Sequence, residues 1–397
     1  MEIGWIDFSK KDRDKVLGVL DLLSETGVLD ELGIAPIRDS FSDLFFPGTS
    51  TLQRRAKYFL IVPYALKDLE LKYQLNEVNL ETLDNIEKET AEQLIINNPD
   101  SGGIIGSDSI RRKGWVQMTP ANIYLAGLRK YGIFNYNKSL KHYINHIRKL
   151  KLSSEEDDYS VNKDDDELID DKNAGKSLNV YKLFISDLYS PNWMKNLSIK
   201  LTPKEADFLK KQIIATCNDS LMAYILKSEN IEEFLKCENF YYLNSIIEDF
   251  PENIKNDYFD AIAFSDFNYA LRVVYNIIVS NDENKEAKQE FNKLDFDKIS
   301  NIDINRIMVS HGIKNNDLRD FLNDSKSCMI NGDMCNLKEV ISKREVNLKG
   351  INRSRTLQSG IYDVDEWFAG KHLNYRFEIG KQIIKDIYEG KNSIEVL

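Results

Sequence analysis

Residues 119–132 read TPANIYLAGLRKYG, and this stretch carries the plainest helix signal in the chain. Thr119 is a residue type that caps helix starts, and Pro120 suits the first helical position because its nitrogen has no hydrogen to leave unpaired. The apolar positions that follow share one helical face: Ile123, Tyr124 and Leu128. Gly132 stands where a helix commonly ends. The stretch therefore predicts one amphipathic helix with defined ends.

Similar signals recur on both sides, so the sequence predicts a mainly α fold. Helical periodicity with start or stop residues predicts further helices between Ser9 and Gly27, over 79–97, over 140–150 after Ser139, after the capping box of Thr202, Pro203 and Glu205, and over about 373–389. Gly390 is expected to close the last of them. Pro63 should kink or break the helix that contains it, because proline removes one backbone hydrogen bond.

The length of 397 residues, with 42% hydrophobic composition, is enough for several packed domains. Shifts in composition predict a multi-domain chain with an all-α middle domain. The expected parts are an N-terminal helical domain (1–100), a basic helix-turn-helix or winged-helix-like module (101–152), an acidic linker (153–176), a helical middle domain (177–337), and a basic C-terminal segment with a helix (338–397). The winged variant would use a short strand over IFNYN, residues 133–137.

Charge is distributed very unevenly along the chain. Residues 101–150 hold nine Lys or Arg and one acid, net +8, whereas residues 153–172 hold ten acids and two lysines, net −8. The whole chain is at −11. A protein with one basic block has a defined face for a polyanion, since the rest of its surface repels phosphate. The sequence thus predicts one docking face within 101–150.

The basic residues of this block are interleaved with aromatic residues, which suits phosphate contact and base stacking. The predicted nucleic-acid-binding residues are Arg111, Arg112, Lys113, Arg129, Lys130, Lys141, Arg148 and Lys149, with Trp115 packing or stacking beside them. Two other interpretations remain open. The cations can favour helix C-termini and face the acidic linker in cis, or they can bind an acidic protein. If the linker folds back, deleting residues 153–172 should tighten DNA binding.

Two further arginine pairs are candidates for a second phosphate contact: Arg54 and Arg55 after a glycine turn, and Arg353 and Arg355 in a glycine-flanked segment. For the first pair the sequence favours a structural role, with partners at Asp39 and Asp43.

Other chemistry has weaker support. His142 and His146 have the i, i+4 spacing of metal ligands, but no third ligand accompanies them, so no metal and no cofactor are predicted. Asp68, Glu70 and Lys72 match half of a restriction-type nuclease core, within a segment of helical period. A metal-dependent nuclease is therefore kept as the alternative to a non-enzymatic protein, which the sequence favours.

The cellular setting follows from what the sequence lacks. No apolar run approaches the ~18 residues of a membrane span, and the first residues do not resemble a signal peptide. Cys217, Cys237, Cys328 and Cys335 form no CxxC pair and are expected to be reduced, mostly buried thiols. We therefore expect a cytoplasmic protein with no membrane partner.

Four stretches carry a resemblance: GWIDFSKKDR (4–13), GVLDELGIAPIRDSFSDLFFPG (27–48), FFPGTSTLQRRAKYFLIVPY (45–64) and, less closely, GKHLNYRFEIGKQIIKDIYEGK (370–391). In them the chain resembles an uncharacterised prokaryotic family associated with antiviral-defence and restriction-like gene clusters, near helicase genes. The resemblance implies a context and no catalytic residues.

Together, the residues and the resemblance predict a DNA-binding or adaptor subunit of a prokaryotic anti-phage complex. The expected partners are DNA, with a duplex favoured, and other defence proteins such as a helicase. Besides the nuclease, a protein-binding scaffold that recruits a helicase is the remaining alternative.

Overall fold

The computed structural model describes residues 30–160, 187–228, 231–363, 366–368 and 372–393. Every regular element within these ranges is a helix, so the predicted mainly α fold is confirmed. The contacts divide the chain into two units. Unit 1 joins Met1–Leu44 to Asn239–Tyr375, and unit 2 joins Phe45–Glu238 to Arg376–Leu397. Each unit combines segments far apart in the sequence, and the five-part division expected above stays a prediction.

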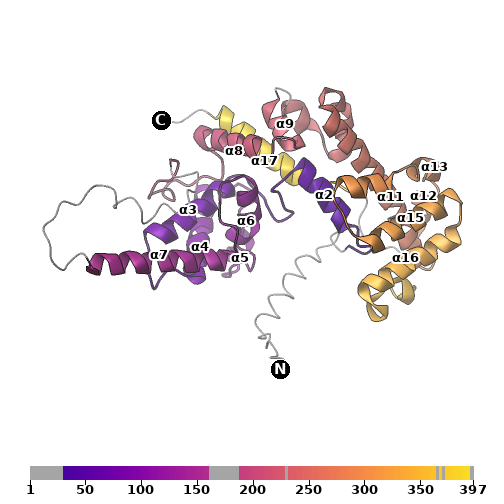
Figure 1. The fold of residues 1–397 in the computed structure, drawn as a ribbon, viewed down its shortest axis with the longest axis horizontal. Coiled ribbons are helices and arrows are strands. Elements are labelled where there is room, and N and C mark those ends of the chain that lie inside the picture. The colour runs from indigo at the N-terminus through magenta and orange to yellow at the C-terminus, as the bar shows by residue number, and fades with distance from the viewer. Residues whose placement is uncertain (1–29, 161–186, 229–230, 364–365, 369–371, 394–397) are drawn as a thin grey trace. The chain divides into compact units, whose positions relative to one another are not determined.

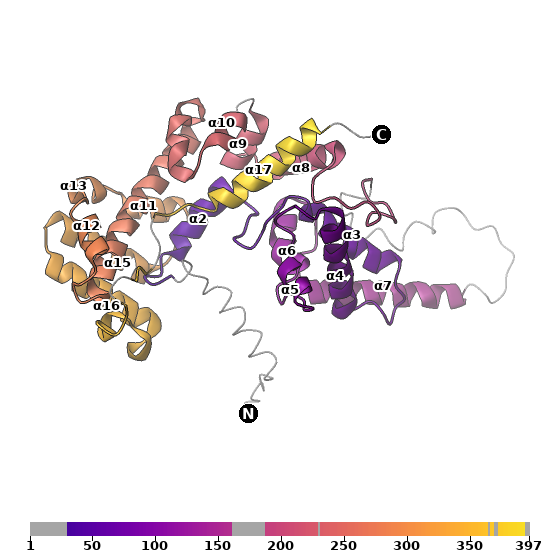
Figure 2. The ribbon, with the colours of Figure 1, turned by 180° about the vertical axis from the view of Figure 1, so that it is seen from behind.

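Unit 2 carries the residues of the basic block. Its helices are α3 (Tyr58–Leu71), α4 (Leu80–Asn97), α5 (Ser107–Arg111), α6 (Pro120–Lys130), α7 (Leu140–Ser160), α8 (Pro203–Thr216), α9 (Leu221–Lys227), α10 (Ile231–Lys236) and α17 (Phe377–Asn392) (Figure 1). α3 packs against both α4 and α6, and α17 packs against α8. In Figures 1 and 2 the C-terminal part of α7 extends past the α3, α4 and α6 group.

α3 forms the centre of the core of this group because its sequence is almost continuously apolar. Phe59 is fully buried and packs edge-on against Tyr124 of α6, with ring centroids 4.9 Å apart. Gly127 of α6 allows the backbone at Gly48 to approach this helix closely, since a Cβ at position 127 would lie 2.3 Å from the carbonyl oxygen of Gly48. Pro63 lies inside α3, so the predicted break does not occur. Tight burial of the surrounding apolar side chains offsets the single backbone hydrogen bond that proline forgoes.

α8 and α17 form a second packed pair in unit 2. The predicted capping box is present: the Glu205 backbone N–H donates to the Thr202 hydroxyl, and the Glu205 carboxylate accepts from the Thr202 N–H at 2.9 Å. α17 starts at Phe377, later than expected, and Gly390 does not close it. Gly390 instead lies against α8, where a Cβ would be 3.0 Å from that of Ala206. The glycine therefore permits close helix packing rather than a chain reversal.

Unit 1 is built around the long helix α11, most of whose C-terminal half is buried. Its elements are α2 (Ala35–Phe45), η1 (Phe240–Ser245), η2 (Ile247–Asp249), α11 (Glu252–Val279), α12 (Lys285–Phe291), α13 (Phe296–Ile299), α14 (Ile304–Ser310), α15 (Asn316–Ile330), α16 (Met334–Lys349), η3 (Ile351–Arg353) and η4 (Thr356–Gln358). α11 packs against α12 and α16, and α16 packs against α15. Figure 1 shows α11, α12, α15 and α16 gathered together.

Two expectations about individual segments have definite outcomes. Residues 133–137 form no strand, so the strand of a winged-helix variant is absent from this part of the chain; Phe134 is buried there as loop core. The helix expected over 140–150 is longer, since α7 runs to Ser160 and takes in the start of the acidic segment. The remainder of that segment and the predicted helix between Ser9 and Gly27 lie outside the described residues.

The thiol prediction is confirmed, with Cys217, Cys237 and Cys328 buried, Cys335 exposed and all four free. Across the described helices, none combines the length and apolar character that crossing a membrane requires.

Candidate nucleic-acid interface

The start of α6 is fixed by a side chain that the sequence pattern did not indicate. Thr119 occupies the N-cap position in extended conformation but makes no side-chain cap to the helix. Instead Glu87 of α4 accepts a hydrogen bond of 2.6 Å from the Ala121 backbone N–H. Burial is the main reason why the pKa of Glu87 rises to about 8. A carboxyl group from α4 thus joins α4 to the helix that leads into the basic face.

Arg129, in the last turn of α6, shapes the loop that follows. Its Nε donates to the Tyr136 carbonyl oxygen at 2.9 Å, and its guanidinium also donates to the Lys138 carbonyl oxygen. The same group lies 5.8 Å from the centroid of the Phe134 ring. Arg129 therefore holds residues 133–139 in place as well as contributing a half-exposed positive charge.

α7 is amphipathic, with one face in the core and the other face basic. The side chains that face inward are Leu140, Tyr143, Ile144 and Ile147. Tyr143 packs edge-on against Phe134 at 5.0 Å, which fixes the helix to the loop that Arg129 holds. The exposed cations of this helix are Lys141, Arg148 and Lys149. Helical spacing thus turns these cations away from the core.

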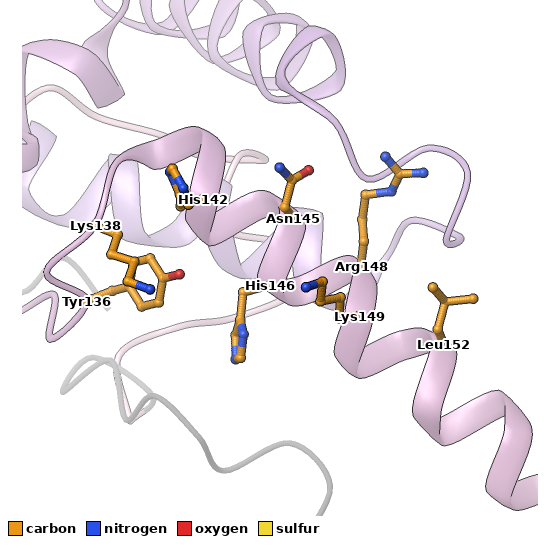
Figure 3. A pocket seen from close by; sticks show the side chains of 8 residues that line it. All are labelled: Tyr136, Lys138, His142, Asn145, His146, Arg148, Lys149 and Leu152. Atoms are coloured by element: carbon orange, nitrogen blue, oxygen red, sulfur yellow. The ribbon is translucent and has the colours of Figure 1, made fainter. Parts of the chain in front are cut away.

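A pocket of about 440 Å³ lies along α7 and the loop before it (Figure 3). Its lining residues are Tyr136, Lys138, His142, Asn145, His146, Arg148, Lys149 and Leu152. Three of them are cations and three carry aromatic or imidazole rings. The Tyr136 and His146 ring centroids are 6.0 Å apart at an interplanar angle of 32°. His142 bonds through Nδ1 to the Ser139 hydroxyl at 2.8 Å. Positive charge and ring surface therefore meet in one concave place.

The other predicted contact residues of the block lie outside this pocket. Arg111, Arg112 and Lys113 are exposed on the turn that ends α5, with Arg111 3.4 Å from Asp108, and Lys130 is exposed at the end of α6. Trp115 is half-buried, and a Cβ on Gly106 would lie 2.5 Å from its ring. The indole thus packs against Gly106, the first of the two roles expected for it. The structure brings Arg148, Lys149 and Lys138 together and leaves residues 111–113 on a separate turn.

The candidates for a second phosphate contact divide into exposed and engaged arginines. In unit 2, Arg54 is exposed, whereas Arg55 donates through Nε to both oxygens of buried Asp386, at 2.9 and 3.0 Å. The partners expected for Arg55, Asp39 and Asp43, were therefore wrong, because Arg55 pairs with Asp386; Asp39 pairs with Arg38 in unit 1. Burial raises the pKa of Asp386 and the Arg55 guanidinium opposes the rise.

In unit 1, Arg353 is exposed and donates to the Lys349 carbonyl oxygen, at 2.9 Å. Arg355 forms an ion pair with buried Glu31, and its guanidinium lies 4.5 Å from the centroid of the Phe368 ring. Lys349 pairs with buried Glu345 at 2.8 Å. Two of the bases near this end of unit 1, Lys349 and Arg355, thus compensate buried carboxylates of the same unit.

The residues of the nuclease alternative are arranged as parts of a helix. Asp68 and Glu70 lie on α3, where residues two apart point in different directions. The Asp68 carboxylate accepts from Trp193 Nε1 at 3.0 Å, from the Tyr189 hydroxyl at 2.5 Å and from Lys72 at 2.9 Å. Glu70 pairs with Lys67. Within the described ranges, His, Cys, Asp and Glu form no group of three or more that could hold a metal.

The fold and this face define a mainly helical protein with a basic, ring-lined pocket. Residues 1–172 match the model of a family described as "Family of unknown function (DUF6361)", and the chain is similar to that family over this stretch. The matched stretch includes the whole of the 101–150 block. No curated protein and no solved structure matches the chain.

Proposed function

We propose that this protein is a non-enzymatic DNA-binding subunit of a prokaryotic antiviral-defence complex, and that it binds DNA with the basic face of unit 2. The observation that carries the proposal is the pocket along α7. Lys138, Arg148 and Lys149 line it together with three rings, in a unit whose loop geometry is held by Arg129.

Electrostatics supports an anionic partner for this face. The chain as a whole is at −11, so long-range repulsion acts on a polyanion everywhere except near the basic block at +8. A nucleic acid would therefore approach in a restricted orientation. Phosphate contacts give affinity through counterion release, which makes binding strongly dependent on salt.

The defence context of the proposal comes from the resemblance of residues 4–13, 27–48 and 45–64 to a family associated with such gene clusters. In that context the protein delivers or retains DNA for a partner, such as a helicase, that performs the reaction.

The test is fluorescence anisotropy of full-length protein with a labelled 20-bp duplex across a salt series. A site of about 4–6 phosphate contacts predicts a log–log slope of about −4 to −5. The triple variant Lys138→Ala, Lys141→Ala and Arg148→Ala removes three exposed cations of this face. Its slope should be smaller in magnitude by about 2–3.

A matched control removes the same charge elsewhere on unit 2. Lys195, Lys200 and Lys211 are all exposed, and their replacement by alanine should leave the slope within about 0.5 of the original. A flat salt dependence of the unmodified protein, or equal slopes for the two triple variants, contradicts the proposal.

A scaffold that binds another protein is the second candidate, favoured by apolar side chains on unit 1. The exposed fractions are 43% for Leu348, 69% for Ile351, 55% for Leu357 and 76% for Ile361. These residues lie close together in sequence, and α16 packs against both η3 and η4. If the protein binds no DNA at low salt, this apolar segment becomes the first surface to test with purified helicase.

A further inference from the structure

We infer that the pocket along α7 takes one unpaired nucleotide, so that the protein binds single-stranded DNA in preference to duplex DNA. The inference rests on the proposed function and names the form of DNA that the same face selects. At about 440 Å³ the pocket is in the lower part of the range for sites that enclose one small ligand. Its volume suffices for one base with its sugar, and a base that is stacked and paired inside a duplex cannot enter it unless the duplex opens.

The rings of the pocket provide a stacking surface. Tyr136 packs edge-on against Tyr143, with centroids 5.5 Å apart and an interplanar angle of 63°. Tyr143 belongs to the buried face of α7, so this contact anchors the Tyr136 ring at the rim of the core. His146 lies at a shallow 32° to it, and His142 is exposed one turn earlier on α7. Stacking of bases on such rings is tolerant of sequence and is the usual source of affinity for single strands.

The cations are placed to hold the phosphates on either side of that base. Lys138 stands on the loop beside Tyr136, whereas Arg148 and Lys149 stand on α7 beyond His146. In Figure 3 Lys138 lies beside Tyr136, and Arg148 and Lys149 follow His146 along α7, with Arg148 on the opposite side of the helix from His146. A strand with its backbone on these cations can place one base between them, against the rings.

The loop geometry is set before any ligand binds. Arg129 donates to the carbonyl oxygens of Tyr136 and Lys138, which are the ring and the cation on the loop side of the pocket. Phe134 belongs to the same loop, and its packing against Tyr143 fixes the loop to α7. A preorganised pocket loses little conformational freedom on binding.

Charge alone would produce the opposite preference. A duplex has the higher density of phosphates and releases more counterions for each contact, so a merely basic face binds duplex more tightly. Bases inside a duplex are stacked and paired, and reaching them requires that the duplex be opened. A measured preference for single-stranded DNA would therefore arise from the rings of the pocket and not from its charges.

The experiment compares a labelled dT20 strand with a labelled 20-bp duplex, using the full-length protein at one fixed salt concentration near 0.1 M. We expect dT20 to bind about ten-fold more tightly, the effect of one to two stacked bases. Three variants then examine the rings without changing the charge of lysine or arginine. Tyr136→Phe keeps its ring, whereas Tyr136→Leu and His142→Leu each remove one.

The preference should persist in Tyr136→Phe and fall at least three-fold in His142→Leu and in Tyr136→Leu. Because His142 is exposed, its variant keeps the fold even if Tyr136→Leu does not, so the result remains decisive. Duplex binding equal to or tighter than dT20 binding overturns this inference and leaves the proposed function intact. Failure to bind either DNA overturns both. A preference for dT20 that is unchanged in both Tyr136→Leu and His142→Leu also overturns the inference.

Discussion

Glu87 has the most unusual environment of the residues that position the basic face. Its carboxyl group is buried, accepts from the start of α6 and has a pKa raised from 4.5 to about 8, mainly by burial. The proton is therefore held more tightly in the folded state than in the unfolded state. The free energy of unfolding should fall as pH rises from about 4.5 to about 8, by at most roughly 5 kcal/mol.

Substitution of Glu87 separates its hydrogen bond from its ionisation. Glu87→Gln keeps an acceptor for the Ala121 N–H and should cost less than about 1 kcal/mol at pH 6, whereas Glu87→Ala should cost about 1–3 kcal/mol. Chemical denaturation between pH 5 and pH 8 measures both effects. If the Gln variant keeps the pH dependence of the original protein, Glu87 is not its source.

Gly127 gives a second prediction at the residue scale. Alanine in a helix is intrinsically favoured over glycine by about 1 kcal/mol. A Cβ at Gly127, however, would lie 2.3 Å from the Gly48 carbonyl oxygen. The clash with this oxygen should outweigh the helix propensity of alanine, and Gly127→Ala should destabilise unit 2 by about 2 kcal/mol or more. Gly114→Ala is the control, since its nearest neighbour would be at 3.6 Å and its melting temperature should change little.

At the scale of elements, the loop of residues 133–139 depends on one side chain. Arg129→Ala removes the donors that hold the Tyr136 and Lys138 carbonyl oxygens. We expect affinity for dT20 to fall about five- to ten-fold while the salt slope changes by less than one, because the main role of Arg129 is to position the loop. Lys130→Ala, at an exposed neighbouring position, is the comparison. If Arg129→Ala instead reduces the magnitude of the log–log salt slope by about one, Arg129 itself contacts a phosphate.

Local sequence patterns predicted the helices better than the contacts between residues far apart in the sequence. The capping box of α8 involves residues within one turn and was predicted, and α4 starts at Leu80, within one residue of the predicted start. The contact of Glu87 with Ala121 of α6 spans 34 positions of the sequence, and that of Arg55 with Asp386 spans 331 positions. A one-dimensional pattern contains no information on such pairs, so the wrong acid was assigned to Arg55.

In the candidate site, too, the sequence predicted local features and did not predict those that depend on distant contacts. The exposure of Arg148 and Lys149 follows from the apolar period of α7, which the sequence already showed. The pocket itself was not foreseen, because it needs the loop geometry that Arg129 creates. Its signal was present in residues 136–146, where Tyr136, His142 and His146 alternate with the cations.

At the scale of the whole molecule, both the turn after α5 and the face of α7 carry exposed cations within one unit. If DNA contacts both, replacing Arg111, Arg112 and Lys113 by alanine should lower duplex affinity at least ten-fold near 0.1 M salt, and reduce the slope by about 2–3. The matched control replaces Lys285, Lys288 and Lys298, which are exposed on unit 1. Equal affinities for the two variants would restrict the interface to α7 and its loop.

Photo-crosslinking can show directly whether DNA lies on the basic face of unit 2. Labelled DNA that carries 5-bromouracil is crosslinked to the full-length protein, and the modified peptides are mapped by mass spectrometry. We expect crosslinks at Tyr136, His142 or His146, the rings of the pocket along α7. Crosslinks confined to unit 1, such as the segment of residues 343–355, would contradict it.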